Sequence, residues 1–321
     1  MAIVEYRQLV EGDIEQLTDV IAKSRACVPY ERKLTPRELR GWILEDPDYQ
    51  PEGNTVACIG HEIVGLGQVY VEKARLDAGK NDAIIDIEVV PEHRNEGVEQ
   101  GLMRWALARM KSKGIPTARM RVDDVNKWKV SVAESFAFAE DYRIFDLERK
   151  GRAPLPTVMV PPDVTLERQL LKECSDDDLR LANDLLNESF VDHYNSVPHS
   201  FERLITWRNF TEDVIVSTVA KARGTAAGIC LTEESVKLNL EKGTKSGYVP
   251  MLGVLPKYRK SGIGKALLAD GMQWLLDRGM DTIAISLVAK NEKAMALYYS
   301  FGFEKANEAV WYTRSTAEDS S

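Results

Sequence analysis

The stretch that decides the fold covers residues 254–268 and has the sequence VLPKYRKSGIGKALL. An apolar run ends at a proline, and Gly262 and Gly264 then open a long helical pattern. Because glycine has no Cβ, the backbone here can approach a bulky anion closely. The first amides of a helix lack intrahelical acceptors, and the helix dipole adds partial positive charge. The nearby cations are Arg259, Lys260 and Lys265. The segment therefore fits a cradle for a diphosphate.

Taken alone, this Arg-x-x-Gly-x-Gly pattern also fits a plain strand-to-helix turn with solvated cations. It is not a P-loop, because no Gly-Lys-Ser/Thr follows at the required spacing. It also departs from the dinucleotide-binding fingerprint, whose third glycine would fall on Leu267.

The same pattern occurs earlier in the chain as VVPEHR, which ends at Arg94, 165 residues before Arg259. Further pairs with this spacing are Ile14 and Leu179, Ile21 and Leu186, Asn126 and Asn291, Phe136 and Phe301, and Phe138 and Phe303. A constant offset over such different residues indicates two copies of one domain. Residues 150–163, KGRAPLPTVMVPPD, are too rich in proline for a helix and suit an extended connector. We therefore predict a first domain at 1–149, a linker at 150–163 and a second domain at 164–321.

Periodicity gives the order of elements within the second copy. Strands are expected at 164–171, 214–222, 225–231, 247–255, 282–288 and 309–313, and helices at 175–186, 201–210, 262–278 and 291–300. The predicted fold class is α/β (α+β), a mixed layered domain used twice.

Length, composition and charge restrict the number of domains and the kinds of partner that we expect. The chain has 321 residues, which suits two domains, and its net charge of −8 argues against nucleic-acid binding. No apolar run approaches the roughly 18 residues that span a bilayer. The four cysteines, Cys27, Cys58, Cys174 and Cys230, form no C-x-x-C pair and have no histidine at zinc-ligand spacing. We expect a cytoplasmic protein with reduced thiols, no metal and no membrane partner.

The residues that follow the glycine loop resemble the corresponding part of a known protein family. Residues 288–303, VAKNEKAMALYYSFGF, follow the loop with a strand, Asn291, a helix containing Tyr298, and Gly302-Phe303. In order and spacing the second copy resembles the GNAT superfamily of acyl-CoA-dependent N-acetyltransferases, and residues 4–148 resemble it as a degenerate copy. The resemblance implies two tandem GNAT-like domains, each with a mixed, mostly antiparallel central sheet flanked by helices.

The resemblance also implies roles for individual residues. The acetyl-CoA site would comprise Leu252, Gly253, Val254, Arg259, Lys260, Ser261, Gly262, Ile263, Gly264, Lys265, Asn291 and Tyr298. Backbone groups of residues 252–254 would pair with the pantetheine arm, and Tyr298 would protonate the departing thiolate. Asn291 also fits a helix N-cap, and Tyr298 also fits a core tyrosine.

The sequence does not identify a general base. An amine with a pKa near ~10 must lose a proton before it attacks, but residues 246–254, SGYVPMLGV, contain no acid. The candidates elsewhere are Glu233, Glu234, His193, His199 and Tyr248 acting through water.

The first copy has lost the binding loop. Glu99 stands at the position of Gly264, Glu96 adds a second negative charge, and Ala133 replaces Tyr298. Asp86 and Glu88 are expected to be solvated charges on a strand face.

These observations predict an acetyl-CoA-dependent N-acetyltransferase that transfers acetyl to a primary amine by direct attack, in its C-terminal domain. The acceptor would be a small molecule or a peptide, with the oligomeric state left open. The alternative is a non-catalytic acyl-CoA sensor or interaction module. An aminoacyl-tRNA-dependent tandem transferase fits less well, because it needs no diphosphate loop.

Overall fold

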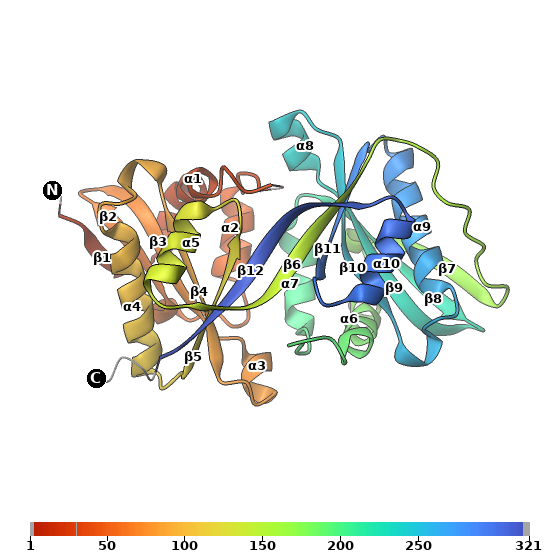
Figure 1. Ribbon diagram of the computed structural model, residues 1–321, viewed down its shortest axis with the longest axis horizontal. Helices are drawn as coiled ribbons and strands as arrows, with labels where there is room; N and C mark the ends of the chain where they lie inside the picture. The colour runs from red at the N-terminus through yellow and green to blue at the C-terminus, as the bar shows by residue number, and fades with distance from the viewer. Residues whose placement is uncertain (1–2, 30, 317–321) are drawn as a thin grey trace. The chain divides into compact units, whose positions relative to one another are not determined.

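The computed structural model describes residues 3–29 and 31–316. The chain forms two compact units (Figure 1). One comprises Met1–Arg143 with Asn307–Ser321, and the other comprises Ile144–Ala306.

The first unit contains six neighbouring sheet strands in the order β1-β2-β3-β4-β5-β12. Its strands are β1 (Glu5–Gln8), β2 (Asn54–Ile59), β3 (Glu62–Tyr70), β4 (Asp82–Val89), β5 (Thr117–Asp123) and most of β12 (Glu304–Ser315). Its helices are α1 (Ile14–Ser24), α2 (Pro36–Ile43), α3 (Lys73–Asp77), α4 (Val98–Ser112) and α5 (Lys127–Ser135).

The second unit repeats this arrangement in the order β7-β8-β9-β10-β11-β6. Its strands are β7 (Val164–Leu170), β8 (Val214–Ala222), β9 (Thr225–Glu234), β10 (Ser246–Val254), β11 (Thr282–Val288) and most of β6 (Ala139–Lys150). Its helices are α6 (Asp176–Phe190), α7 (Phe201–Phe210), α8 (Val236–Lys242), α9 (Ile263–Asp277) and α10 (Glu292–Ser300). The mixed, mostly antiparallel sheet expected for each copy is confirmed. The expected strands and helices of the second copy are present, and α8 was not predicted.

The two copies exchange their last strands. β6 ends the first copy, but its residues Ile144–Lys150 pair antiparallel with β11. β12 ends the second copy, but its residues Ala309–Ser315 pair with β5. The boundaries predicted at 149 and 164 follow the sequence repeat, whereas the compact units change at Arg143 and Asn307. Neither copy by itself supplies all the strands of its own sheet.

Local sequence explains several element boundaries. Ser175 begins α6 with a capping box, in which its hydroxyl accepts from the amide of Asp178. The β8–β9 hairpin turns at Arg223 and Gly224, which both have positive φ, 49° and 78°. Two consecutive residues of positive φ match the twist of a tight antiparallel hairpin.

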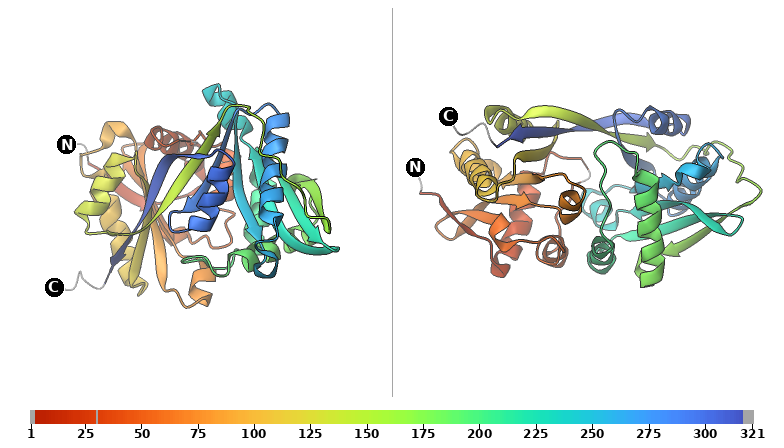
Figure 2. Two further views of the ribbon diagram at one scale, coloured as in Figure 1. Left: turned by 45° about the vertical axis from the view of Figure 1, so that its right-hand side comes forward. Right: turned by 90° about the horizontal axis from the view of Figure 1, so that it is seen from below.

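Helices cover both faces of the sheet in the second unit (Figure 2, right). On one face, α9 and α10 pack with β6, β10 and β11 in a buried cluster that includes Leu147, Leu267 and Leu275. On the other, α6 contributes Leu185 and Leu186 to a separate cluster with β9. Burial on both faces explains the nearly continuous apolar run of β11.

In each sheet one parallel pair is short. β10 and β11 pair only over Ser246–Val249 and Thr282–Ile285. Beyond these residues β10 stays paired with β9, and β11 stays paired with β6. β10 and β11 therefore separate at one end of the sheet, while each of these two strands stays hydrogen-bonded to its neighbour on the other side.

The proline-rich linker lies along α9. Arg152 donates to the carbonyl of Leu276 near the end of this helix (2.9 Å), and Leu155 and Val158 pack on the core. Pro161 lies beside Gly262 at the start of the helix. Between β6 and β7 the chain has no regular secondary structure, and it packs against α9 through these contacts.

Within residues 3–29 and 31–316, no helix combines the length and the apolar character needed to cross a membrane.

The exchange makes a stability prediction. Leu147 belongs by sequence to the first copy but is fully buried in the core of the second unit. Leu147→Ala should cost about 2–5 kcal/mol through lost burial and a cavity. Hydrogen exchange in the full chain should accelerate in β10, β11 and α9 and remain slow in β3 and β4.

The matched control is Leu66→Ala, which removes an equally buried leucine from the core of the first unit. It should give the reverse pattern of exchange. Equal acceleration in both units by either variant would contradict the exchange.

Candidate active site

The split between β10 and β11 forms a cleft of about 640 Å³. Its walls come from β10 (Val249, Pro250, Met251, Leu252, Gly253, Val254), β11 (Ile285, Ser286, Leu287, Val288), α10 and the residues before it (Asn291, Lys293, Ala294, Leu297, Tyr298), the glycine loop (Tyr258, Arg259, Lys260, Gly264), α6 and the loop after it (Ser189, Phe190, His193, His199) and Ile144 of β6. Most of these side chains are apolar, which suits a ligand with a long, weakly polar arm.

The glycine loop has the backbone of an anion site. Lys260 and Gly262 have positive φ, 63° and 89°, on either side of Ser261. Alternation of this kind turns successive N–H groups toward one point. In the described part of the chain, no amide from Lys260 to Gly264 donates to a backbone carbonyl, and the first such bond runs from Ala266 to Gly262. The loop therefore presents unpaired donors at the mouth of the cleft.

The predicted loop residues are not equivalent in the structure. Lys260 and Gly264 line the cleft, whereas Ser261, Gly262, Ile263 and Lys265 do not. Ile263 is buried in the core, so only its backbone amide is available to a ligand. A Cβ built on Gly264 would lie 3.5 Å from Val254 Cγ2, an ordinary contact, so this position has room for a methyl group.

Arg259 braces the loop with its side chain. Its guanidinium donates to the carbonyls of Val254 (3.2 Å) and Ser189 (2.9 Å) and forms a bidentate ion pair with Asp192. The hydrogen bond from Arg259 lowers the pKa of Asp192 to about 2. The sequence analysis expected the positive charge of Arg259 to face a diphosphate. In the structure this charge is instead paired with the carboxylate of Asp192.

The first copy repeats this brace. Arg94 donates to the carbonyls of Val89 (3.1 Å) and Ser24 (2.9 Å), each 165 residues before its counterpart. The shared role of the two arginines is thus to tie the loop to the end of α1 in the first unit and to the end of α6 in the second.

The remaining predicted binding residues lie along the cleft. Leu252 and Val254 pair with Cys230 and Gly228 of β9, which leaves their other edge toward the split. The Asn291 side chain accepts from the amide of Ala294 (3.1 Å), so it caps α10 and lines the cleft at the same time.

Tyr298 is both a core residue and a cleft residue. Its side chain is only 6% exposed and lies 6.0 Å from Phe303 between ring centroids, yet it lines the cleft. Burial raises the pKa of Tyr298, and the neighbouring Cys230 and Tyr248 raise it further. The phenol therefore stays protonated throughout the neutral range and remains a hydrogen-bond donor.

The candidate bases divide into two groups. His193 and His199 line the cleft, and burial lowers the pKa of His193, so its ring is neutral at pH 7. Glu233 and Glu234 do not line it. Glu234 pairs with Arg278, and Glu233 accepts from Ser235 Oγ (3.3 Å).

The remaining candidate, Tyr248, donates to Ser286 Oγ (3.0 Å), which donates to Asp146 Oδ1 (2.6 Å). Ser286 lines the cleft. Asp146 was missed by the sequence analysis because it belongs to the first copy. Its position on β6 is opposite Ser286 in the register with β11.

In the first copy the same places are filled by charged side chains. Glu99 is 3% exposed and accepts from the amide of Asn95 (2.7 Å), the counterpart of Lys260. Asn95 and Gly97 keep the positive φ values of the loop, 63° and 94°. The carboxylate of Glu99 thus occupies a donor that the second copy leaves open.

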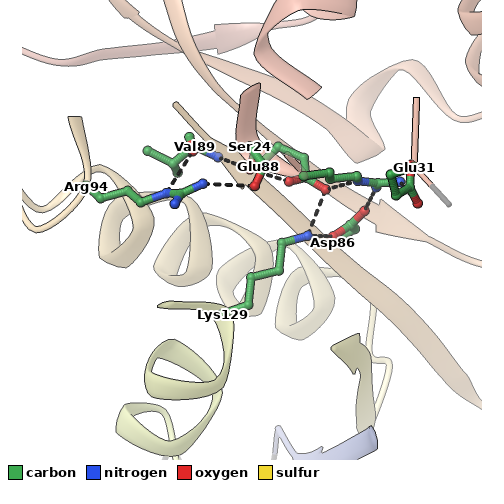
Figure 3. A network of polar contacts seen from close by, with 8 residues as sticks. Ser24, Glu31, Asp86, Glu88, Val89, Arg94 and Lys129 are labelled. Atoms are coloured by element: carbon green, nitrogen blue, oxygen red, sulfur yellow. Dashed lines mark hydrogen bonds and ion pairs between the residues drawn. The ribbon is translucent and has the colours of Figure 1, made fainter. Parts of the chain in front are cut away.

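The split in the first sheet holds an ion network (Figure 3). Lys129 Nζ binds Asp86 (2.8 Å) and Glu88 (2.7 Å), and Arg25 binds the same two carboxylates. Ser24 Oγ also donates to Glu88. The expectation that Asp86 and Glu88 are solvated is wrong, since Glu88 is 1% exposed and both are paired. The reason is non-local, because their partners come from α5 and from the residue after α1.

The pKa directions fit a charged network. Burial alone would lower the pKa of Lys129, but the charges of Asp86 and Glu88 raise it. Burial likewise opposes ionisation of Asp86, and Lys129 and Arg25 lower its pKa. Removing one partner from such a buried cluster typically costs about 3–5 kcal/mol. The network therefore fills the split of the first sheet with fixed charge.

Comparisons with known proteins agree with two copies of one acetyltransferase-like domain. Residues 17–138 and 182–303 each match the acetyltransferase (GNAT) family. Mycothiol acetyltransferase from Salinispora arenicola is 27% identical over 310 residues, covering 94% of this chain and 94% of that protein. The protein of the same name from Salinispora tropica is 29% identical over 307 residues, covering 94% and 92%.

Among solved structures, a tandem GNAT protein from the clavulanic acid biosynthesis pathway has a TM-score of 0.75 at 15% identity, covering 98% of this chain and 99% of that one. A GCN5-related N-acetyltransferase from Sphaerobacter thermophilus has a TM-score of 0.68 at 18% identity, with 98% and 96% covered. These two show a shared fold. No group of three or more His, Cys, Asp or Glu able to hold a metal occurs among the described residues. With family matches over most of its length and two copies of the fold, the chain belongs to the acetyltransferase (GNAT) family as a tandem-domain N-acetyltransferase that uses an acyl-CoA donor.

Proposed function

We propose that this enzyme transfers the acetyl group of acetyl-CoA to a primary amine in the cleft of the second unit. The observation that carries the proposal is the contrast between the two loops. The amides from Lys260 to Gly264 have no backbone acceptor in the described chain, whereas the amide of Asn95 donates to Glu99. Loop amides of the second copy would hold the diphosphate, and the split between β10 and β11 would take the pantetheine arm.

The chemistry follows from the groups in the cleft. The amine attacks the thioester carbonyl, and an amide on β10, at Leu252 or Val254, would polarise the carbonyl oxygen. The C–S bond breaks with its electron pair on sulfur, Tyr298 would donate a hydrogen bond to that sulfur, and the proton that the nitrogen loses ends on the thiolate to give the free thiol. Because burial raises the pKa of this phenol above its ordinary value, it contributes chiefly by donating a hydrogen bond to the developing thiolate.

The identity of the acceptor amine and the cellular location of the enzyme are further parts of the proposal. A screen of primary amines should include amino sugars, amino acid amides, short peptides and desacetyl-mycothiol, since the relatives described above are named mycothiol acetyltransferases. Release of free thiol from acetyl-CoA reports turnover. A cytoplasmic location remains a prediction from the sequence.

Stoichiometry tests the contrast between the copies. Calorimetric titration with acetyl-CoA should give one site per chain, because Glu99 and the Lys129 network fill the equivalent places in the first unit. Two equivalent sites would contradict the assignment to the second unit.

Gly264→Glu tests the loop. It introduces at this position the carboxylate that Glu99 supplies in the first copy. Repulsion from a diphosphate charge about 4 Å away is worth about 4 kcal/mol at an effective dielectric constant of about 20. Acetyl-CoA affinity in titration should therefore fall by at least about a hundredfold.

Gly264→Ala is the matched control. Its methyl group makes only an ordinary contact with Val254, so binding should change by less than about fivefold. Unchanged affinity in a folded Gly264→Glu variant would mean that the anion binds elsewhere.

Tyr298→Phe tests the donor to sulfur. It keeps the ring that packs beside Phe303 and removes only the hydroxyl. The KM for acetyl-CoA should change little, and kcat should fall by roughly 10²-fold, the usual scale of acid catalysis. The loss should shrink with a donor whose thiol is more acidic, because that thiolate needs less help to leave.

The control is Tyr299→Phe, the same change at the next position of α10, where the side chain is 47% exposed. It should leave kcat unchanged. Full activity of Tyr298→Phe would reduce this tyrosine to a packing role.

A further inference from the structure

No carboxylate lines the cleft of the second unit in the part of the chain that the structure describes. The ionisable side chains that do line it are Arg259, Lys260, Lys293, Tyr258, Tyr298, His193 and His199. Arginine, lysine and tyrosine side chains already carry their proton at neutral pH, whereas a neutral imidazole can take one up. An amine that loses a proton inside this cleft therefore has only the two histidines, among the described lining residues, to receive it.

His193 has an imidazole without a polar partner. Across residues 3–29 and 31–316, its ring forms no hydrogen bond or ion pair, and neither ring nitrogen is fully buried. The ring makes an edge contact with Phe190, 4.6 Å between ring centroids, and the backbone amide of His193 donates to the Phe190 carbonyl (2.9 Å). His199 is fixed differently, because the Asn187 side chain accepts from its amide (2.7 Å) and donates to its carbonyl (3.1 Å). The ring nitrogens of His193 are therefore available to a ligand in the cleft.

His193 and Tyr298 reach the cleft from opposite faces of the sheet. Phe190, which contacts His193, belongs to α6, and a Cβ built on Gly253 of β10 would lie 3.5 Å from its Cε2 atom. Tyr298 belongs to α10 and packs in the cluster with α9 on the other face (Figure 2, right). The β10 amides proposed to polarise the thioester carbonyl lie between these two faces. An amine can therefore approach from the α6 side while the sulfur leaves toward α10.

The first unit lacks this imidazole. Val28 stands 165 residues before His193 and is 6% exposed, and Arg25 stands at the position of Phe190. Arg25 belongs to the ion network that fills the first split. The imidazole is therefore not part of the common fold, and it occurs in the copy whose cleft is open.

We propose that His193 is the general base, which takes the proton that the acceptor ammonium must lose before it attacks the thioester. This inference rests on the proposed amine acetylation. It supplies the proton acceptor that residues 246–254 of β10, which contain no acid, do not provide.

The transfer begins with the ammonium, which gives one proton to the unprotonated ring nitrogen of His193. The free amine forms the C–N bond, and the C–S bond breaks with its electron pair on sulfur. The second nitrogen proton ends on the thiolate to give the free thiol, and the imidazolium returns its proton to solvent. Each ammonium acetylated therefore releases one proton. Desolvation in a cleft with mainly apolar walls lowers the pKa of the ammonium and favours the first transfer.

The surroundings of His193 keep its ring neutral before the transfer. Burial lowers the pKa of His193, Asp192 raises it, and Arg259 lowers it again. Because other charges are near, the pH profile of a variant is read against matched variants. The ionisable groups that line this cleft or contact its rim are Asp192, Tyr194 and His199 on the loop after α6, Tyr258, Arg259 and Lys260 on the glycine loop, and Lys290, Lys293 and Tyr298 on or beside α10.

His193→Gln is the central variant, studied in the full chain. Glutamine keeps a polar side chain but takes up no proton in the neutral range. With the alkyl primary amine of highest kcat/KM in the screen described above, kcat/KM should fall about tenfold to a hundredfold at pH 7. Hydroxylamine is already largely unprotonated at neutral pH and needs no base before attack. With this acceptor the fall should be less than about threefold, after subtraction of the uncatalysed reaction.

The pH dependence separates a proton acceptor from a structural residue. In wild type, kcat/KM for the alkylamine should be level between the pKa of His193 and that of the ammonium, because the enzyme uses the ammonium form. In His193→Gln it should instead rise about tenfold per pH unit toward ~10, because only the free amine supplied by solvent reacts. The loss caused by the substitution should therefore diminish as pH rises.

Two controls accompany this variant. His61→Gln changes an exposed histidine in the turn between β2 and β3 of the first unit, and it should leave the pH profile unchanged. Added imidazole should raise the activity of His193→Ala with the alkylamine by at least about threefold, because it can replace the missing base. The same imidazole should leave wild type unchanged.

Several results would overturn the inference. An equal loss with both acceptors at every pH would assign His193 a structural role, and full activity of His193→Gln would remove it from catalysis. A level profile in His193→Gln with a tenfold rise per pH unit in His199→Gln would make His199 the base. Acetyl-CoA affinity, measured by calorimetry, should change by less than about threefold in His193→Gln, and a fall that matches the loss in kcat/KM would assign His193 to donor binding. If wild type itself neither binds acetyl-CoA nor acetylates any amine, the proposed function fails instead.

Discussion

The pairing of β6 with β11 is the contact on which the second unit depends. It runs from Ile144 opposite Val288 to Lys150 opposite Thr282, and it closes the outer side of β11. Because β11 is held on that side, its other edge can leave β10 beyond Ile285 without becoming an unpaired strand. A split sheet normally exposes backbone groups that cost free energy when buried. Here β6 supplies hydrogen-bond partners to one edge of β11, so fewer backbone groups are left unpaired. A cleft can therefore exist at a place where a core would otherwise form.

The two units show how one backbone supports opposite outcomes. Both keep the pair of positive φ values in the loop and the arginine that ties the loop to the end of α1 or α6. In the first unit, charged side chains fill the split between β4 and β5 and form ion pairs with one another. Lys129, for example, binds Asp86 and Glu88. In the second, Ala294 replaces Lys129 and lines an open cleft. The difference between a filled and an open split therefore resides in a few side chains.

Much of the fold could be predicted from the sequence because its signals are local or periodic. The repeat offset, the glycine loop and the helix caps each depend on residues close in sequence, and the structure contains the corresponding elements. The strand exchange could not be predicted, because β6 and β12 have similar patterns and either could complete either sheet. Asp146 was missed for the same reason, since it was assigned to the copy whose site is degenerate. The engagement of Arg259 by Asp192 also depends on where the loop after α6 lies in space, which no pattern near either residue shows.

The exchange of last strands also bears on how the chain could be divided. A cut within the linker, between Pro154 and Pro161, would leave each fragment with a strand that belongs in the other fragment's sheet. The two pieces would then be complementary halves that assemble as a heterodimer, each incomplete without its mate. The same reciprocity gives the first copy a structural role even though its loop is blocked. Its final strand completes the sheet beside β11, which lies more than a hundred residues downstream.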